Sequence, residues 1–362
     1  MTQESAPSTG PPDAAPDHPT AQTGEHELMT LERPLDGLST RAGTQPALDR
    51  RERVACNLCG GTRFGVVYRH CPDRLHGFSG DHQLVRCRGC GLGQTNPRMD
   101  RESIALAYPP SYGSFTRAEP RGGVVRLVRE TARRLYEARW GPSELAPTSP
   151  TGDRALDLGT GTGEALAALA RAGWQAWGVE PDEQAAGLAA RHSGLADDRL
   201  LVATAEMAEF PDDSFDLVVA SHVIEHLHDP KAVLEKIHGW LDGDGRLILR
   251  CPNFGSLERR LFGRWWFALD LPRHLYHFSP ATLRRMLEEA GYKVVGSRPQ
   301  LQGMTLSGSV QHVVNALRSR PGDFRMNRLL YYVLFPLGTV LVLVGWSSCI
   351  EFEARPVRRP AS

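Results

Sequence analysis

Short apolar runs alternate with helical segments throughout the second half of the chain. The predicted strands are residues 155–158, 176–180, 200–203, 215–220, 245–251 and 292–297. Strands that alternate with helices favour a parallel sheet covered by helices, which is an α/β fold. The last segment, CIEFEARPV, alternates apolar Ile350 and Phe352 with charged Glu351 and Glu353. That alternation is typical of a half-exposed antiparallel strand of the edge type.

The chain before this region shows three other patterns. Residues 1–50 are rich in Pro, Thr, Ala and acidic residues and lack apolar periodicity, so we predict a disordered tail. Residues 51–110 form a small cysteine-containing domain, residues 111–150 a linker with a helix, and residues 151–357 the large domain. The helix is predicted over 124–140, and two interpretations stay open: it docks on the large domain, or it lies on a membrane surface. The positions at helical spacing that would form its docking face are Val124, Val128, Thr131, Leu135 and Trp140.

Residues 329–346, LLYYVLFPLGTVLVLVGW, form an apolar insertion of 18 residues without a charge. This length is at the lower edge of what spans a membrane. Pro336 and Gly338 would let the segment break into two halves and return, which favours a peripheral or re-entrant membrane contact over a true span. A buried or dimer-forming helix is the other alternative. The arginines that precede the run are Arg318, Arg320, Arg325 and Arg328.

Charge and cysteine content narrow the class of protein. The 42 basic and 42 acidic residues cancel, so no global field attracts nucleic acid, and we expect no nucleic-acid partner. Seven cysteines, an odd number, without a signal-type N-terminus favour a reducing compartment. We therefore expect a cytoplasmic protein, with membrane association through the apolar run left open.

Four of the cysteines form two C-x-x-C pairs, each followed by glycine. They are Cys56, Cys59, Cys87 and Cys90. Four thiolates in two tight turns predict a tetrahedral Zn²⁺ site, which is closed and therefore structural. Iron also fits four thiolates, but zinc is the usual occupant of such ribbons.

The stretch RALDLGTGTGEALAALA, residues 154–170, runs from an apolar strand through Gly159, Gly161 and Gly163 into an alanine-rich helix. A dinucleotide fingerprint needs glycine where Glu164 stands, so the turn disfavours a pyrophosphate and a nicotinamide cofactor. Asp157, just ahead of the turn, repels phosphate but suits an ammonium group or a ribose hydroxyl. The expected ligand is a nucleoside with a zwitterionic tail.

Together with VEPD and EMAEFPDDSFDLVVASHVIEHLHDP, this turn resembles the cofactor site of class I S-adenosyl-L-methionine-dependent methyltransferases. The resemblance implies a Rossmann-like seven-stranded sheet behind the small zinc ribbon. It also implies that Glu180 binds the ribose hydroxyls and that Ala205 and Glu206 approach the adenine. Ser221 ends the fourth strand beside the cofactor. Thr204 departs from the family, in which many members carry Asp there.

His222, Glu225 and His226 spell H-x-x-E-H, an inverted zinc-protease motif. That motif needs a long helix, whereas here it stands at a strand end, so we expect no zinc there. We expect His226 to be a hydrogen-bond partner at a helix start.

The segment after the fifth strand lines the acceptor pocket in proteins of this class. A hydroxyl or enolisable carbon needs a base, and histidine suits that role near neutral pH. His274 is the first candidate base, His277 the second, and Tyr276 an orienting donor; alternatively His274 anchors its loop. Trp265 and Trp266 would either floor the acceptor or pack the core. The resemblance predicts a methyltransferase for a small-molecule, sugar or lipid-linked acceptor, and the alternative is a non-catalytic zinc-ribbon scaffold.

Overall fold

The structure is a computed structural model that describes residues 49–109, 112, 123–141, 153–301, 304–318 and 324–358. The described residues belong to one compact unit. The predicted disordered tail lies outside them except for its last two residues, and so does most of the linker on either side of its helix.

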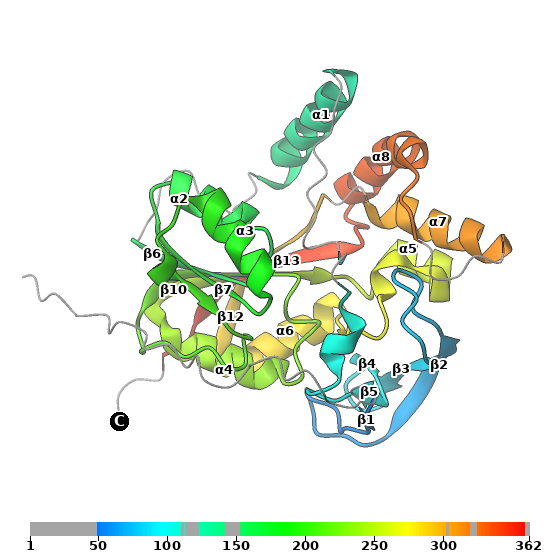
Figure 1. Ribbon diagram of the computed structural model, residues 1–362, viewed down its shortest axis with the longest axis horizontal. Coiled ribbons are helices and arrows are strands. Elements are labelled where there is room, and N and C mark those ends of the chain that lie inside the picture. Colours follow the sequence, from blue (N-terminus) through cyan, green and yellow to red (C-terminus); the bar gives the residue numbers. More distant parts are fainter. Residues whose placement is uncertain are drawn as a thin grey trace, which may run out of the picture. The chain divides into compact units, whose positions relative to one another are not determined.

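A seven-stranded sheet forms the centre of the large domain, with the strand order β12-β13-β10-β9-β6-β7-β8 (Figure 1). Neighbouring strands are parallel except at β13, which is antiparallel to both β10 and β12. The expected α/β fold with a seven-stranded class I sheet is confirmed. The strands are β6 (Arg154–Leu158), β7 (Gln175–Glu180), β8 (Leu200–Val202), β9 (Phe215–Ser221), β10 (Leu241–Pro252), β12 (Tyr292–Pro299) and β13 (Cys349–Pro356).

The expected position of the last strand was wrong. β13 lies inside the sheet between β10 and β12, and the edge strand is β12. Glu351 is buried because arginines on both neighbouring strands, Arg250 and Arg298, bind its carboxylate. The alternation of charged and apolar residues therefore arises from ion pairs within the sheet, where paired charges are tolerated.

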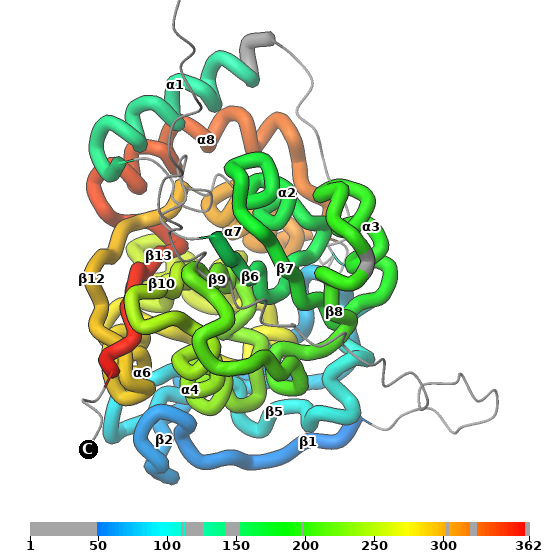
Figure 2. The backbone as a smooth tube through the Cα atoms, turned by 90° about the vertical axis from the view of Figure 1, so that its left-hand side faces the viewer, coloured from blue at the N-terminus to red at the C-terminus, as the bar shows by residue number. Residues whose placement is uncertain are grey.

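Helices cover both faces of this sheet (Figures 1 and 2). α2 and α3 lie on one face, and α4 and α6 lie on the other. Asp182, Asp229 and Ser279 each accept a backbone N–H at the start of α3, α4 or α6, which satisfies donors that a helix leaves open. The α-helices of this part are α2 (Glu164–Arg171), α3 (Glu183–Ser193), α4 (Pro230–Trp240), α5 (Leu257–Phe262), α6 (Pro280–Glu289) and α7 (Met304–Leu317). The short 3₁₀ turns are η1 (Ile104–Ala107), η3 (Asp197–Arg199), η4 (Gly263–Trp265) and η5 (Phe267–Leu269).

The cysteine-containing region shares a sheet with the large domain. Its strands are β1 (Arg51–Glu52), β2 (Phe64–Cys71), β3 (His82–Cys87), β4 (Gly93–Thr95) and β5 (Arg98–Met99). β1 pairs with β5, and the four-stranded sheet has the order β11-β4-β3-β2. β11 (Tyr276–His277) comes from the predicted acceptor segment. The N-terminal region is thus hydrogen-bonded directly to that segment.

The linker helix α1 (Gly123–Trp140) is present as predicted, but its buried face differs. Thr131, Val128 and Leu135 of the expected docking face are exposed. The buried positions are instead Ala132 and Tyr136, because Tyr136 donates its hydroxyl to the Pro299 carbonyl at 2.9 Å. The helix packs along α8 (Figure 2).

The apolar run forms one helix, α8 (Arg328–Leu343), with Pro336 inside it. The expected break at Pro336 and Gly338 was wrong: the helix continues through both residues, and its side chains Phe335, Thr339 and Val342 are buried. Among the described residues, no helix is long and apolar enough to cross a membrane.

Candidate active site

The glycine turn lies where β6 meets α2, and its glycines have positive φ angles of 75°, 52° and 82° at Gly159, Gly161 and Gly163. A Cβ at Gly159 would lie 2.5 Å from Val223 Cγ2. A Cβ at Gly163 would lie 2.7 Å from the Ala189 Cα in α3. Glycine is therefore required at both positions by conformation and by close packing.

Two predicted cofactor carboxyls are buried beside this turn. Glu180, at the end of β7, accepts the N–H of Gly161 at 2.8 Å and that of Asp182 at 3.1 Å. Asp157 is 2% exposed, and its Oδ2 has no hydrogen-bond partner among the described residues. Burial, helped by the charge of Glu180, raises the pKa of Asp157 to about 7.

The other predicted cofactor residues lie at the same edge of the sheet, where the carboxyl ends of the parallel strands meet. Ala205 follows β8 and is buried, and Ser221 ends β9. Glu206 accepts the backbone N–H of His228 at 2.9 Å and pairs with Arg101 at 3.4 Å. The structure thus brings all four parts of the predicted site to one edge: the Asp157–glycine turn, Glu180, Ala205–Glu206 and Ser221.

The H-x-x-E-H stretch forms a turn after β9 and no long helix, so the zinc-protease motif lacks its scaffold, as expected. α4 begins only at Pro230, so the expectation that His226 stands at a helix start was wrong. Its Nδ1 lies 3.2 Å from the Arg273 carbonyl and 2.9 Å from the Tyr108 hydroxyl. A carbonyl only accepts, so Nδ1 carries the proton and Nε2 is an acceptor.

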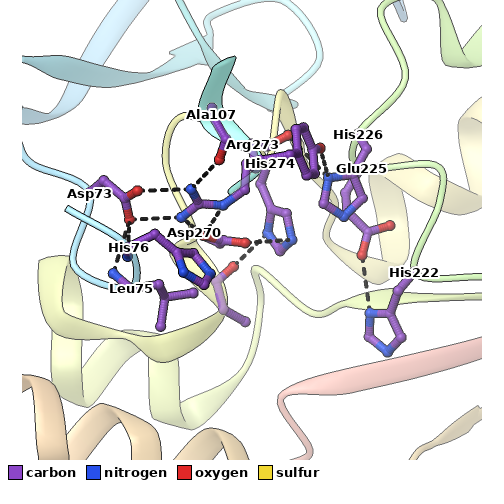
Figure 3. A network of polar contacts seen from close by, with 12 residues as sticks. Asp73, Leu75, His76, Ala107, His222, Glu225, His226, Asp270, Arg273 and His274 are labelled. Atoms are coloured by element: carbon purple, nitrogen blue, oxygen red, sulfur yellow. Dashed lines mark hydrogen bonds and ion pairs between the residues drawn. The ribbon is translucent and has the colours of Figure 1, made fainter. Parts of the chain in front are cut away.

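His274 is 7% exposed and lies beside His226, with the ring centroids 4.7 Å apart (Figure 3). Its Nδ1 donates to the Ala268 carbonyl at 3.0 Å, which leaves Nε2 as an acceptor. That Nε2 lies 3.8 Å from Oδ2 of Asp270. The predicted base therefore has its free nitrogen and a carboxylate on the same side.

Glu225 is a site residue that the sequence named only within the H-x-x-E-H motif, without giving it a role in the site. It is 1% exposed; Oε1 accepts from Nδ1 of His222 at 3.1 Å, and Oε2 has no partner among the described residues. Burial raises its pKa, but the hydrogen bond from His222 and the nearby His222, His226 and His274 together outweigh burial and lower the pKa to about 2. Polar atoms of Glu225, His226 and His274 lie within 4.8 Å of one another. The only signal in the sequence was its place next to His226 at a strand end.

Tyr276 and His277 are neighbours in β11, so their side chains point to opposite faces. The Tyr276 hydroxyl accepts from Arg98 at 3.0 Å and donates to the His228 carbonyl at 3.2 Å, both in the interior. His277 lies beside His274, with ring centroids 6.3 Å apart, and burial lowers its pKa to about 3. The structure therefore brings His277, and not Tyr276, to the His274 side.

The two tryptophans of the acceptor segment differ. Trp266 is 1% exposed and donates its Nε1 to Ser348 Oγ at 3.1 Å, so it packs in the core. Trp265 is partly exposed, and its carbonyl lies near the His312 ring. Of the two interpretations, core packing holds for Trp266.

The four cysteines of the ribbon come together. Sγ of Cys56 lies 3.4 Å from Sγ of Cys90, and Sγ of Cys59 lies 3.5 Å from Sγ of Cys87. Sulfurs on one tetrahedral Zn²⁺ lie about 3.8 Å apart, given a Zn–S bond of about 2.3 Å. The Gly89 N–H points at the Cys87 sulfur at 3.4 Å, as it does where backbone amides stabilise a thiolate. The residues present therefore fit a structural zinc ion.

Comparison with known proteins identifies the class. A family model described as a methyltransferase domain matches residues 129–297. Residues 129–297 form a class I S-adenosylmethionine-dependent methyltransferase domain. The protein is an S-adenosylmethionine-dependent methyltransferase with an N-terminal four-cysteine cluster.

Its similarity to individual proteins is low. A ubiquinone biosynthesis O-methyltransferase of Xanthomonas axonopodis pv. citri is 28% identical over 158 residues, 41% of this chain and 66% of that enzyme. An uncharacterized methyltransferase of Mycobacterium sp. is 36% identical over 118 residues, 32% of this chain and 44% of that protein. A solved complex of the Haloferax volcanii Trm112 methyltransferase activator with a methyltransferase has a TM-score of 0.43 and 20% identity, covering 66% of this chain and 96% of that one.

Proposed function

We propose that this methyltransferase transfers a methyl group to a hydroxyl oxygen of a small-molecule, sugar or lipid-linked acceptor. The observation that carries the proposal is the cluster of Glu225, His226 and His274. This cluster lies next to the glycine turn, because Val223, two residues before Glu225, packs against Gly159. Its available atoms are hydrogen-bond acceptors: Nε2 of both histidines and Oε2 of Glu225. Such a cluster binds a neutral group that donates protons, as a hydroxyl does.

His274 is the proposed base. As the acceptor oxygen attacks the methyl carbon, the carbon–sulfur bond of S-adenosylmethionine breaks, and the hydroxyl proton passes to Nε2 of His274. Asp270, 3.8 Å from that nitrogen, stabilises the imidazolium that forms. His277 remains the second candidate, although its deeper burial makes it a weaker proton acceptor.

The cofactor assignment rests on the glycine turn and the residues at its edge. In the proposed complex Glu180 exchanges its N–H partners for ribose hydroxyls, and Asp157 faces the ligand's ammonium group. Ala205, Glu206 and Ser221 line the adenine side. Transfer to oxygen also agrees with the printed name of the Xanthomonas relative, a ubiquinone biosynthesis O-methyltransferase.

We propose Zn²⁺ as the metal of the four-cysteine cluster. A four-thiolate site is closed, so the ion would support folding and would not contact the acceptor.

The test of the function is calorimetry with S-adenosylhomocysteine followed by transfer of labelled methyl groups into cell extracts. Wild-type protein should bind the ligand, and Gly161→Arg should abolish binding because its side chain would fill the turn. His274→Gln should bind the ligand as wild type does but lose methyl transfer by about a hundredfold or more. Binding without any methylated product would favour the scaffold alternative, and absence of binding by wild type would refute the proposed methyltransferase function.

We also propose that α8 contacts a membrane surface peripherally. Its exposed apolar residues follow helical spacing along one face: Leu329, Val333, Leu337, Val340 and Val344. Arg325 and Arg328 precede this stripe, and α1 beside it carries exposed Arg126 and Arg129. Apolar residues flanked by arginines suit anionic lipid headgroups.

A further inference from the structure

One fully buried guanidinium ties the N-terminal region to the candidate base. Arg273, 0% exposed, has five N–H donors, and the structure gives each of them an acceptor (Figure 3). Two bonds go to Asp73 at 2.7 and 2.8 Å, two to Asp270 at 2.5 and 2.9 Å, and one to the Ala107 carbonyl at 2.8 Å. The guanidinium is therefore fully used inside the protein and is not available to an anionic acceptor.

Asp73 comes from the loop between β2 and β3, 200 residues away in the sequence. It is 2% exposed and accepts the backbone N–H groups of Leu75, His76 and Phe78. These bonds fix the carboxylate in one orientation before it meets Arg273. A bidentate arginine–carboxylate pair then fixes the guanidinium plane as well.

Asp270 is the link to His274. Its φ of 31° and ψ of 52° place it in the left-handed region, which a non-glycine residue adopts at a cost and retains only where the surroundings hold it. Arg273 supplies that hold through two bonds to Oδ1. The other carboxylate oxygen, Oδ2, then faces Nε2 of His274.

The same region also holds the His274 backbone. Thr95, the last residue of β4, donates its hydroxyl to the His274 carbonyl at 2.7 Å and its N–H to the Leu275 carbonyl at 2.9 Å. Main chain and side chain of the candidate base are thus both fixed by the cysteine-containing region.

We infer that the N-terminal region completes the active site, and that Asp73 is a positioning residue which acts on His274 through Arg273 and Asp270. This inference rests on the proposed role of His274 as the base. It gives the ribbon a function in the reaction: it holds the imidazole with Nδ1 on the Ala268 carbonyl and Nε2 toward the acceptor.

The physical effect of removing the Asp73 charge follows from the shared guanidinium. Arg273 now divides its hydrogen bonds between two carboxylates. With asparagine at position 73, the guanidinium turns to Asp270 alone and pulls that carboxylate away from His274. A carboxylate beside Nε2 favours a proton on that nitrogen, so its withdrawal leaves the Ala268 carbonyl alone to select the Nδ1-protonated tautomer, and it removes the charge that stabilises the imidazolium.

The test uses full-length, zinc-loaded protein labelled with ¹⁵N-histidine and saturated with S-adenosylhomocysteine. His274→Gln assigns the ring-nitrogen signals of His274. In wild type we expect two well-separated ¹⁵N shifts, one of a protonated Nδ1 and one of an unprotonated Nε2. In Asp73→Asn the two shifts should move further apart, because the carboxylate that favours a proton on Nε2 has moved away, while zinc content and ligand affinity stay as in wild type.

Asp81→Asn is the matched control, because Asp81 lies in the same region but is exposed and pairs with His70. It should leave the His274 signals unchanged. Unchanged His274 signals in a folded Asp73→Asn protein would overturn the inference. If Asp73→Asn loses zinc or fails to fold, Arg273→Lys is measured instead: a changed separation of the two shifts supports the inference, and wild-type shifts overturn it.

The readout does not depend on methyl transfer, so the two proposals fail separately. A His274 that responds to Asp73 in a protein without methyl-transfer activity would refute the proposed function and leave the positioning intact.

Discussion

Asp157 and Glu180 are two carboxyls buried within the same turn, and the protein treats them differently. Glu180 has two backbone N–H donors, whereas one oxygen of Asp157 has no partner among the residues that the structure describes. Burial raises the pKa of Asp157 by more than the backbone N–H of Leu166 lowers it, so Asp157 favours its protonated form up to about pH 7.

This difference predicts how stability depends on pH. Because the pKa of Asp157 is raised from 3.8 to about 7 in the folded state, its contribution to stability is full below pH 3.8 and is lost as the pH rises through about 7. Asp157→Asn removes this loss. We compare the free energy of unfolding of Asp157→Asn with that of wild type, both without ligand. The difference in favour of the variant should grow by about 2 to 3 kcal/mol between about pH 5 and about pH 8.

Chemical denaturation of both proteins at the two pH values measures this advantage. The variant should also bind S-adenosylhomocysteine more weakly than wild type. An advantage that stays constant with pH would show that Asp157 ionises normally.

Individual site residues also differ in whether the sequence could predict them. Asp157, Glu180 and the glycines lie within one short stretch or its neighbouring strand end, so local spacing was enough to find them. Glu225 became recognisable only through burial and through His274, which reaches it from a distant segment. The sequence suggested that the Tyr276 hydroxyl orients the methyl acceptor. In the structure this hydroxyl instead accepts a hydrogen bond from Arg98, at the end of the ribbon region.

At the scale of elements, the glycine turn is packed against the turn after β9. Gly159→Ala would push a methyl group into Val223 and would hold alanine at a φ of 75°. We expect the affinity for S-adenosylhomocysteine to fall by about tenfold or more, as calorimetry would measure.

Gly173→Ala separates the two causes. Gly173 has a φ of 93° but open space around its Cβ direction, so alanine there meets only the conformational penalty of about 1 kcal/mol. That control should bind the ligand normally. Equal losses in both variants would mean that the contact with Val223 has no part in binding.

The cysteine turns give a second prediction for elements. Cys59→Ser should remove the zinc ion and destabilise the ribbon, because thiolate binding and folding are coupled in so small a module. Metal analysis should find about one zinc per wild-type chain and almost none in the variant. Cys71→Ser is the control, since Cys71 is a buried cysteine outside the four-cysteine cluster. A fully folded wild-type protein without metal would contradict the prediction.

The strands show what periodicity predicts well and what it misses. The parallel strands are short apolar runs, and each predicted run lies within or beside an observed strand. β13 was misplaced because period-two alternation indicates one polar face without saying whether water or an arginine meets it. Glu351 meets Arg250 and Arg298, and that pairing is set by strands far away in the sequence.

At the scale of the whole molecule, contacts between segments distant in the sequence determine how the ribbon region joins the large domain, which composition could not predict. The sequence divides cleanly into a ribbon, a linker and a large domain, yet β4 pairs with β11, and Asp73 pairs with Arg273. No local sequence pattern predicts such pairs, because the hydrogen bonds of each partner form only after the two distant segments have come together in the fold. The same reasoning applies to α1. Its contacts with α8 and the hydrogen bond from Tyr136 to the Pro299 carbonyl determine which of its faces is buried.

The exposed apolar stripe of α8 is the surface that we propose contacts a membrane. Val333 and Leu337 are 64% and 51% exposed, one turn apart on the same face, while Phe335 and Val342 face the protein. If this face meets a membrane, wild-type protein should sediment with vesicles that contain anionic lipid and should bind neutral vesicles less. High salt should release it only in part, because apolar burial is not screened, whereas detergent should release it fully.

Val333→Glu with Leu337→Glu should abolish sedimentation without changing ligand affinity, since neither side chain lies in the core. Val295→Glu is the matched control: Val295 is an exposed valine of the edge strand β12 and lies outside α8, so its substitution should leave vesicle binding intact. A protein that ignores vesicles and is dimeric by sedimentation equilibrium, but becomes monomeric in the double variant, would assign the stripe to a second copy of the chain. A monomer without vesicle affinity would refute the membrane proposal, and the case for a lipid-linked acceptor would lose its structural support.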